Sequence, residues 1–316
     1  MNRSIYTVYL AGLGMISGAL SAQAGEAGDR CPAEPGTAPS GELHAERIAI
    51  ADNAAAGLYE GPVWRDGTLY FSHFLFTDGF PSKVLAYSQG ELTTALADSG
   101  SNGLALDEHG ELVAGTHKYK AVSRFDLDSG ERETLAERYK GEVFNSPNDL
   151  TVDRDGRLYF TDPDFQRRAA PGGQPVTGVY QVDGDKVRLL DGTIANPNGI
   201  SLSPDEKTLY VAGGGESGYV RAYDLTSEFP YSQRVLLDGV VVPDGMAVDC
   251  LGNLYITEHT AQRVRVVNPE GEVIAQIQLD ANVTNGAFGG DEGKTLYLTG
   301  MGSLWKLELD VAGLPY

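Results

Sequence analysis

The chain of 316 residues repeats one short pattern six times, and this repeat limits its possible folds more than any other feature. A polar, turn-forming cluster precedes Leu, usually Tyr, and an apolar residue, as in DGTLYF, DGRLYF, DEKTLYV, GNLYI and GKTLYL, with HGELVAG as a degenerate copy. The Leu residues occupy positions 69, 112, 158, 209, 254 and 296, so successive copies are 42 to 51 residues apart. So regular a period indicates repeated structural units.

A second set of polar residues keeps the same period and lies 9 to 11 residues before each Leu. We call these residues the anchors: Glu60, Asn102, Asn148, Asn198, Asp244 and Asn285. Each unit has room for about four short β-type runs separated by Gly, Asp and Asn, which is typical of a propeller blade. The sequence therefore predicts an all-β, six-bladed β-propeller with four-stranded blades around a central channel. It would fill residues 43–316 as one domain, although length alone suggests two.

The two ends of the repeat predict how the ring closes. A strand-like segment, His44–Ile50, precedes the first unit, whereas the last unit has room for few strands after Leu296. We expect the N-terminal strand to complete the last blade, which would remove an exposed sheet edge. The 40 Gly residues, about twice the ordinary share, are then explained by the many hairpin turns.

The N-terminus is typical of an exported protein. Residues 1–24 combine Arg3, an apolar stretch and the small-residue sequence Ala22-Gln23-Ala24, as a cleaved signal peptide does. A membrane anchor is the alternative, but Ser, Thr and Gly interrupt a stretch shorter than a membrane span requires. Residues 25–42 mix Gly, Pro, Ser and charge, and we expect a flexible leader there. The expected location is the periplasm or the extracellular space.

Cysteine content and charge limit the possible partners. In an oxidising compartment Cys31 and Cys250 can form a disulfide, and two unpaired thiols are the equally weighted alternative. The net charge of −20 disfavours nucleic acid and, after signal cleavage, anionic membranes, whereas cations and a small neutral molecule remain suitable. We expect a monomer or a small homo-oligomer.

The anchors predict a metal site. If they begin the innermost strands, their two carboxylates and four amides converge at one mouth of the channel. Oxygen ligands of this kind suit Ca²⁺ better than metals that prefer nitrogen or sulfur, with Zn²⁺, Mn²⁺ and Mg²⁺ left open. The alternative is that Asn-Gly and Asp-Gly are ordinary turn dipeptides. That alternative explains less well why the polar residue recurs in register with the repeat.

Five ordered segments resemble the gluconolactonase family, also known as the SMP-30, regucalcin and luciferin-regenerating enzyme family. They are EGPVW at 60–64, FNSPNDLTVDRDGRLYFTDP at 144–163, PNGISLSPDEKTLYV at 197–211, PDGMAVDCLGNLYIT at 243–257 and TNGAFGGDEGKTLYLTG at 284–300. The similarity extends over nearly all of residues 43–310. It implies a six-bladed propeller with one divalent metal, commonly Ca²⁺, that hydrolyses sugar lactones.

The resemblance also implies residue roles. Glu60, Asn198 and Asp244 correspond to metal ligands, and Asn148 to a residue that contacts metal in some members and substrate in others. Asp244 would also be the general base. Asn102 and Asp162 are further candidates for substrate contacts. Three departures, at Val143-Phe144, His73 and the GGG following YVA, lie on the substrate side, so they leave the substrate open and the metal site intact.

The expected reaction is metal-dependent hydrolysis of an aldonolactone, such as gluconolactone, to the aldonic acid. Asp244 would take a proton from the attacking water or orient it while the metal stabilises the developing negative charge. The alternatives are a phosphotriesterase-like or fluorophosphatase-like hydrolase on the same scaffold, and a calcium-binding propeller without catalysis. His73, His117 and His259 follow inner strands, and each either faces the channel mouth or is an ordinary blade residue.

Overall fold

A computed structural model describes residue 1, residues 30–50 and residues 57–315. The predicted export signal therefore lies almost entirely outside the described residues. The described part is built almost wholly from strands, with two short 3-10 turns, η2 (Arg167–Ala169) and η3 (Gly215–Ser217). Within it, no helix is both long and apolar enough to cross a membrane.

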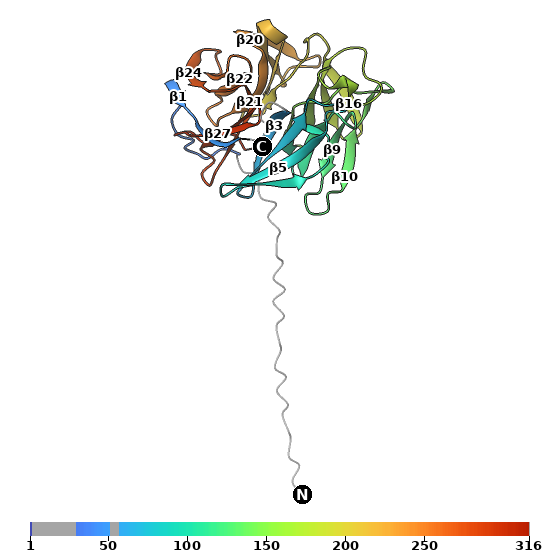
Figure 1. Cartoon of the computed structure of the whole chain (residues 1–316), viewed down its shortest axis with the longest axis horizontal. Helices are drawn as coiled ribbons and strands as arrows, with labels where there is room; N and C mark the ends of the chain where they lie inside the picture. The colour runs from blue at the N-terminus through green and yellow to red at the C-terminus, as the bar shows by residue number, and fades with distance from the viewer. Residues whose placement is uncertain (2–29, 51–56, 316) are drawn as a thin grey trace.

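The predicted six-bladed β-propeller is confirmed, and the blades follow one another around the ring in chain order (Figure 1). Blade 1 contains β3 (Gly57–Arg65), β4 (Thr68–Leu75), β5 (Ser82–Ser88) and β6 (Glu91–Leu96). Blade 2 contains β7 (Ser101–Leu106), β8 (Leu112–Thr116), β9 (Ala121–Phe125) and β10 (Arg132–Ala136). Blade 3 contains β13 (Leu150–Val152), β14 (Leu158–Asp162), β15 (Gly178–Asp183) and β16 (Lys186–Asp191). Blade 4 contains β17 (Ile200–Leu202), β18 (Thr208–Gly213), β19 (Gly218–Asp224) and β20 (Ser232–Val240). A small hairpin of β11 (Arg138–Tyr139) and β12 (Glu142–Val143) separates blades 2 and 3.

The last two blades complete the ring and receive the N-terminal strands. Blade 5 contains β21 (Pro243–Val248), β22 (Leu254–Glu258), β23 (Arg263–Val267) and β24 (Val273–Gln278), and blade 6 contains β25 (Val283–Gly289), β26 (Thr295–Gly300) and β27 (Ser303–Glu308). As predicted, an N-terminal strand, β2 (Glu46–Ile50), pairs antiparallel with β27 and supplies the fourth strand of blade 6. The sequence did not predict β1 (Gly41–His44), which pairs parallel with β24 and covers the outer edge of blade 5.

Residues 30–42, expected to belong to a flexible leader, lie against the propeller. Ala312 donates its backbone N–H to the carbonyl of Pro35 (2.7 Å), and Thr37 donates to the carbonyl of Asp310 (3.0 Å). These backbone contacts need no apolar periodicity, which is why the composition of the segment did not reveal them. The domain accordingly includes residues before position 43.

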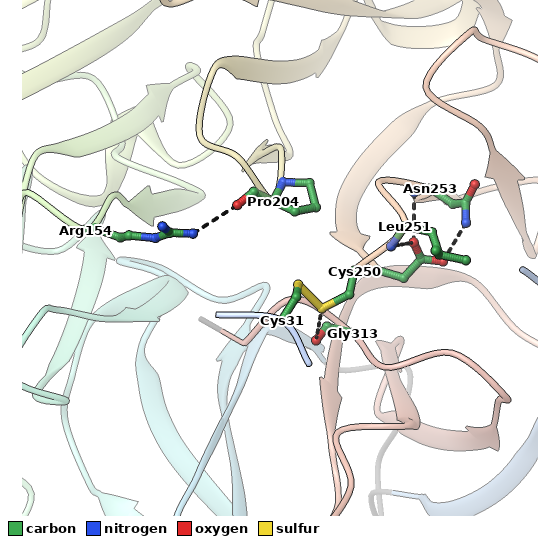
Figure 2. Close-up of a disulfide and its surroundings, with 8 residues drawn as sticks. Cys31, Arg154, Pro204, Cys250, Leu251, Asn253 and Gly313 are labelled. Atoms are coloured by element: carbon green, nitrogen blue, oxygen red, sulfur yellow. Dashed lines mark hydrogen bonds between the residues drawn. A yellow bond between two sulfur atoms is a disulfide. The ribbon is translucent and has the colours of Figure 1, made fainter. Parts of the chain in front are cut away.

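The two cysteines form the disulfide that the sequence left open. Cys31 is bonded to Cys250, with a Cα–Cα distance of 5.5 Å and a sequence separation of 219 residues (Figure 2). Cys250 lies in the turn between β21 and β22. Because each inner strand begins at the anchor end, this turn lies at the opposite face of the ring from the anchors. The disulfide thus fastens the N-terminal segment far from the predicted site.

The apolar core lies between the blades and leaves the axis to polar side chains. Six clusters of buried apolar residues each join two neighbouring blades, so that every blade interface contains one. Between blades 1 and 2, for example, Val63 and Val84 pack with Leu104 and Leu112. Around the axis, each first strand contacts the next, from β3 through β7, β13, β17 and β21 to β25 and back to β3. This arrangement brings the six anchors together.

Candidate active site

The anchors lie within the first four residues of the innermost strands or up to two residues before them. The strand register shifts beside four of them, between Glu60 and Val63, Ser101 and Leu104, Pro243 and Met246, and Val283 and Asn285. An irregularity of this kind redirects side chains near the end of a strand. All six anchor residues are buried, between 1% and 8% exposed.

At Gly103 and Gly245, the glycine after the anchor is required by close packing around the axis and not by a hairpin turn. A Cβ on Gly245 would lie 2.0 Å from Cγ of Asn285, and one on Gly103 would lie 2.6 Å from the carbonyl oxygen of Asn148. Neither glycine has a positive φ. The turn-dipeptide alternative is therefore wrong for these two positions, because the absence of a side chain lets the next anchor approach.

Asp244 is held from two sides by residues of neighbouring segments. Asn198 donates its Nδ2 hydrogen to Oδ1 of Asp244 (2.7 Å), and Nδ1 of His259 lies 3.3 Å from Oδ2. Burial alone lowers the pKa of His259, but the hydrogen bond and the charge of Asp244 outweigh it and raise this pKa above its usual range. Two of the predicted site residues, Asn198 and Asp244, are thereby in direct contact.

Glu60 and Asp149 bring two more carboxylates into the same channel. Glu60 accepts a hydrogen bond from the backbone of Gly61 (3.0 Å), and its pKa is raised well above the usual value by burial and by the charges of Asp244 and Asp149. Burial, with the charge of Asp244, also raises the pKa of Asp149 to about 7, although the side chain of Asn285 (3.1 Å) opposes this shift. Mutual repulsion of this kind is relieved by a bound cation.

Sequence reasoning missed Asp149, which follows the anchor Asn148 directly. Its signal was present in the Ser-Pro-Asn-Asp motif, where an acid follows the anchor amide and stands immediately before the apolar strand β13. Asp149 accepts hydrogen bonds from the backbone of Leu150 (3.1 Å) and from Asn285. It therefore links the anchors of blades 3 and 6 across the axis.

The channel has the donor chemistry of a site for a hard cation. Oδ1 of Asn102 is buried without a hydrogen-bond partner, and an unsatisfied amide oxygen of this kind is a potential metal ligand. Among the described residues, no three or more His, Cys, Asp or Glu side chains are grouped closely enough to hold a metal ion. A cation here would therefore need the amide oxygens as well as Glu60 and Asp244.

The carboxylate of Asp162, which the sequence predicted as a substrate contact, is engaged by the backbone. It is fully buried, and its two carboxylate oxygens accept the backbone N–H groups of Asn145 and Ser146, both at 2.8 Å. Burial raises its pKa to about 7, against the opposing effect of these hydrogen bonds and of Lys120. The carboxylate is thus committed to the segment that precedes Asn148.

The three candidate histidines differ in their surroundings. The ring of His73 meets Tyr59 edge-on at 5.0 Å, and Nε2 of His117 lies 2.7 Å from the carbonyl oxygen of Phe80. The fully buried His117 has its pKa lowered to about 4, chiefly by burial. Only His259 of the three contacts an anchor carboxylate within the described structure.

Comparison with known proteins gives three informative matches. A gluconolactonase from Zymomonas mobilis is 30% identical over 220 residues, which cover 64% of this chain and 61% of that protein. The structure of a gluconolactonase from Xanthomonas campestris matches with a TM-score of 0.72 and 29% identity, covering 88% of this chain and all of that one. Regucalcin from Agrobacterium tumefaciens, a calcium-binding protein, shares the fold with a TM-score of 0.69 at 18% identity, covering 88% and 98% of the two chains.

The family is established by a match that includes most of the propeller. The chain spans less than two thirds of the length of the Zymomonas relative. The match to that relative therefore does not by itself assign its activity to this chain. A family model described as the SMP-30/Gluconolactonase/LRE-like region, however, matches residues 58–302, which is well over half of the chain and includes all six anchors. The chain therefore belongs to the SMP-30/gluconolactonase/LRE-like family.

Proposed function

We propose that this protein hydrolyses a sugar lactone, such as gluconolactone, to the aldonic acid with the help of one divalent cation, Ca²⁺. The observation that carries the proposal is the placement of Asp244, held by Asn198 and His259 in a channel that also contains Glu60. The relatives named gluconolactonase support the substrate class. The calcium-binding regucalcin supports a divalent cation on the same fold.

The cation would be held by four residues, Glu60, Asn148, Asn198 and Asp244, with Asn102 close by. When bound, it supplies Lewis-acid stabilisation of the negative charge that develops on the lactone carbonyl oxygen. The donor set contains only carboxylate and amide oxygens, which favours Ca²⁺ among the common cations. A cation would bind here because it neutralises the repulsion between the carboxylates of Glu60 and Asp244.

The side chains of the channel would perform the remaining steps. Asp244 takes a proton from the attacking water, or orients that water, as a general base. The amides of Asn102 and Asn148 donate and accept hydrogen bonds and would position the hydroxyl groups of the sugar. Asp162 contributes indirectly by holding the backbone before Asn148.

We also propose that the protein acts outside the cytoplasm. The predicted signal peptide motivates this proposal, and the disulfide between Cys31 and Cys250 supports it because such bonds persist mainly in oxidising compartments. N-terminal sequencing of the protein recovered from its native host provides the test. A mature N-terminus near residue 25 is expected, and an intact Met1 on the recovered protein would refute cleavage.

The reaction is tested by pH-stat titration with glucono-1,5-lactone, other aldonolactones and a fluorophosphate, with and without chelator. We expect lactone hydrolysis that a chelator abolishes and Ca²⁺ restores. Asp244→Asn should lower kcat by at least about 100-fold, the usual contribution of a general base. Asp185→Asn, at an exposed residue of the turn between β15 and β16, is the matched control and should retain full activity.

The outcomes separate the proposed function from its alternatives. Lactone hydrolysis that is insensitive to chelator, or retained by Asp244→Asn, would refute the mechanism. Turnover of the fluorophosphate without turnover of any lactone would favour the phosphorus-directed hydrolase. Ca²⁺ binding without turnover of any compound would favour a binding propeller.

A further inference from the structure

We propose that His259 is a positioning residue for Asp244, the last member of a directional hydrogen-bond chain that runs from Gln262 through Asn282. The inference rests on the proposed function, because it assigns a role in orienting the carboxylate of the same site. His259 lies in the turn that connects β22 to β23, directly after Glu258. Its imidazole is largely buried, with 17% of the side chain exposed.

The contacts of Nδ1 determine which ring nitrogen carries the proton. Nδ1 lies 3.3 Å from Oδ2 of Asp244 and 3.0 Å from the backbone carbonyl oxygen of Val283. An ionised carboxylate and a carbonyl oxygen can only accept hydrogen bonds. The proton of a neutral His259 therefore belongs on Nδ1, where it is shared between the two acceptors.

The contacts of Nε2 complete the chain. Nδ2 of Asn282 lies 3.3 Å from Nε2 of His259, and Nε2 of Gln262 donates to Oδ1 of Asn282, also at 3.3 Å. With its oxygen occupied by Gln262, the Asn282 amide turns its NH₂ group toward the ring, so Nε2 of the neutral imidazole accepts. The chain thus runs from Gln262 to Asn282 to His259, whose Nδ1 lies against Val283 and Asp244, and it fixes the orientation of the ring.

The turn that carries His259 is firmly held. The neighbouring Glu258 is fully buried, pairs with Arg263, and accepts hydrogen bonds from Arg265 (2.9 Å) and from the backbone of Val241 (2.7 Å). The backbone N–H of His259 also donates to the carbonyl of Val242 (3.1 Å). A group on so well-braced a turn can hold a carboxylate in one orientation.

The consequence for Asp244 is a carboxylate with each oxygen fixed from a different side. Oδ1 accepts a hydrogen bond from Asn198, and Oδ2 lies 3.3 Å from Nδ1 of His259, which leaves each oxygen further lone-pair capacity toward the channel. Loss of the His259 contact would free the carboxylate to rotate about its last bond. Mutation of a residue in such a supporting position typically lowers activity or metal affinity by about 10- to 100-fold.

Two nearly isosteric variants isolate the donor to Asp244. His259→Leu removes both ring nitrogens, whereas His259→Asn removes the Nε2 contact but retains an N–H donor near the position of Nδ1. We expect His259→Leu to lower kcat for glucono-1,5-lactone about 10- to 100-fold with KM changed less than about twofold, and His259→Asn to recover most of the loss. His109→Leu, at an exposed histidine in the turn between β7 and β8, is the control.

A measurement on the wild-type protein tests the contact without activity or metal. Nitrogen-15 NMR of the imidazoles at alkaline pH should show protonated Nδ1 and unprotonated Nε2 for His259, identified by its disappearance in His259→Leu. A proton on Nε2 would overturn the inference, as would wild-type kcat in His259→Leu or equal loss of kcat in the folded Leu and Asn variants. Wild-type protein with the expected proton position but no lactone turnover would instead refute the proposed function.

Discussion

The packing of Gly245 against Asn285 predicts that one added methyl group disrupts the centre of the ring. In Gly245→Ala the new Cβ would lie 2.0 to 2.4 Å from three side-chain atoms of Asn285, a residue that is 4% exposed. Overpacking of this kind costs about 1–3 kcal/mol. If Asn285 is displaced, its hydrogen bond to Asp149 is also lost, which costs about 1.5–3 kcal/mol for a charged acceptor.

The expected net loss of unfolding free energy in Gly245→Ala is about 1.5–5.5 kcal/mol. This range subtracts about 0.4–1 kcal/mol that any Gly-to-Ala change gains through the unfolded state. The control is Gly192→Ala, where a Cβ would make ordinary contacts at 3.5 Å and φ is not positive. We expect this control to be neutral or slightly stabilised.

Urea-induced unfolding, followed by circular dichroism, measures both variants against the wild type. The free energies follow from the midpoints and slopes of the transitions. Gly245→Ala should also lose lactone hydrolysis, because Asn285 borders the carboxylates of the channel. If the two variants differ by less than about 1 kcal/mol, the glycine is not required for close approach and the reasoning is refuted.

The remaining predictions concern pH, the disulfide and the cation. Burial lowers the pKa of His117 from 6.5 to about 4. The unfolded state therefore binds a proton at a higher pH than the folded state, and stability falls as the pH drops from 6.5 toward about 4. His117→Gln should remove a slope of up to about 1.4 kcal/mol per pH unit, measured by urea unfolding between these pH values, and an unchanged slope would contradict the assignment. Replacing Cys31 and Cys250 by Ser should cost about 2–5 kcal/mol, because the bond closes a loop over 219 residues of separation, and equal stability of the two proteins would argue against it. Ca²⁺ at about 100 times its Kd should stabilise the wild type by about 2.7 kcal/mol, and a thermal scan should show almost no stabilisation of Glu60→Gln. Equal shifts in the two proteins would mean that the ion binds elsewhere.

Much of the fold followed from local sequence. The five Leu-Tyr units, the degenerate sixth unit at Leu112 and the six anchors kept one period, and the structure has the six four-stranded blades that this period predicted. The strand that closes blade 6 was also predicted, because the last unit was too short to supply all its strands. The parallel pairing of β1 and the attachment of residues 30–42 were not predicted, since backbone contacts at a sheet edge leave no pattern in side-chain hydropathy.

The candidate site was predicted only in outline. The register of the anchors indicated that Glu60, Asn198 and Asp244 meet at the axis, and the structure places Asn198 against Asp244. The sequence did not reveal Asp149, and it assigned Asp162 to the substrate although its carboxylate holds a loop. From the sequence alone, an Asp whose carboxylate accepts backbone N–H groups cannot be distinguished from an Asp whose carboxylate faces a channel.

By itself, the sequence determined the architecture, because a repeated unit of four short strands can bury its faces only against copies of itself. It also determined which residues approach the axis, since ring closure brings equivalent positions of the blades together. Only the tertiary structure decided the partners of each side chain. Asn285 and Asp149 are 136 residues apart in the chain, and His259 reaches Asp244 through a turn of blade 5. Such contacts depend on side-chain direction at irregular strand starts and on the absence of a Cβ at Gly245, and both are consequences of how the closed ring packs.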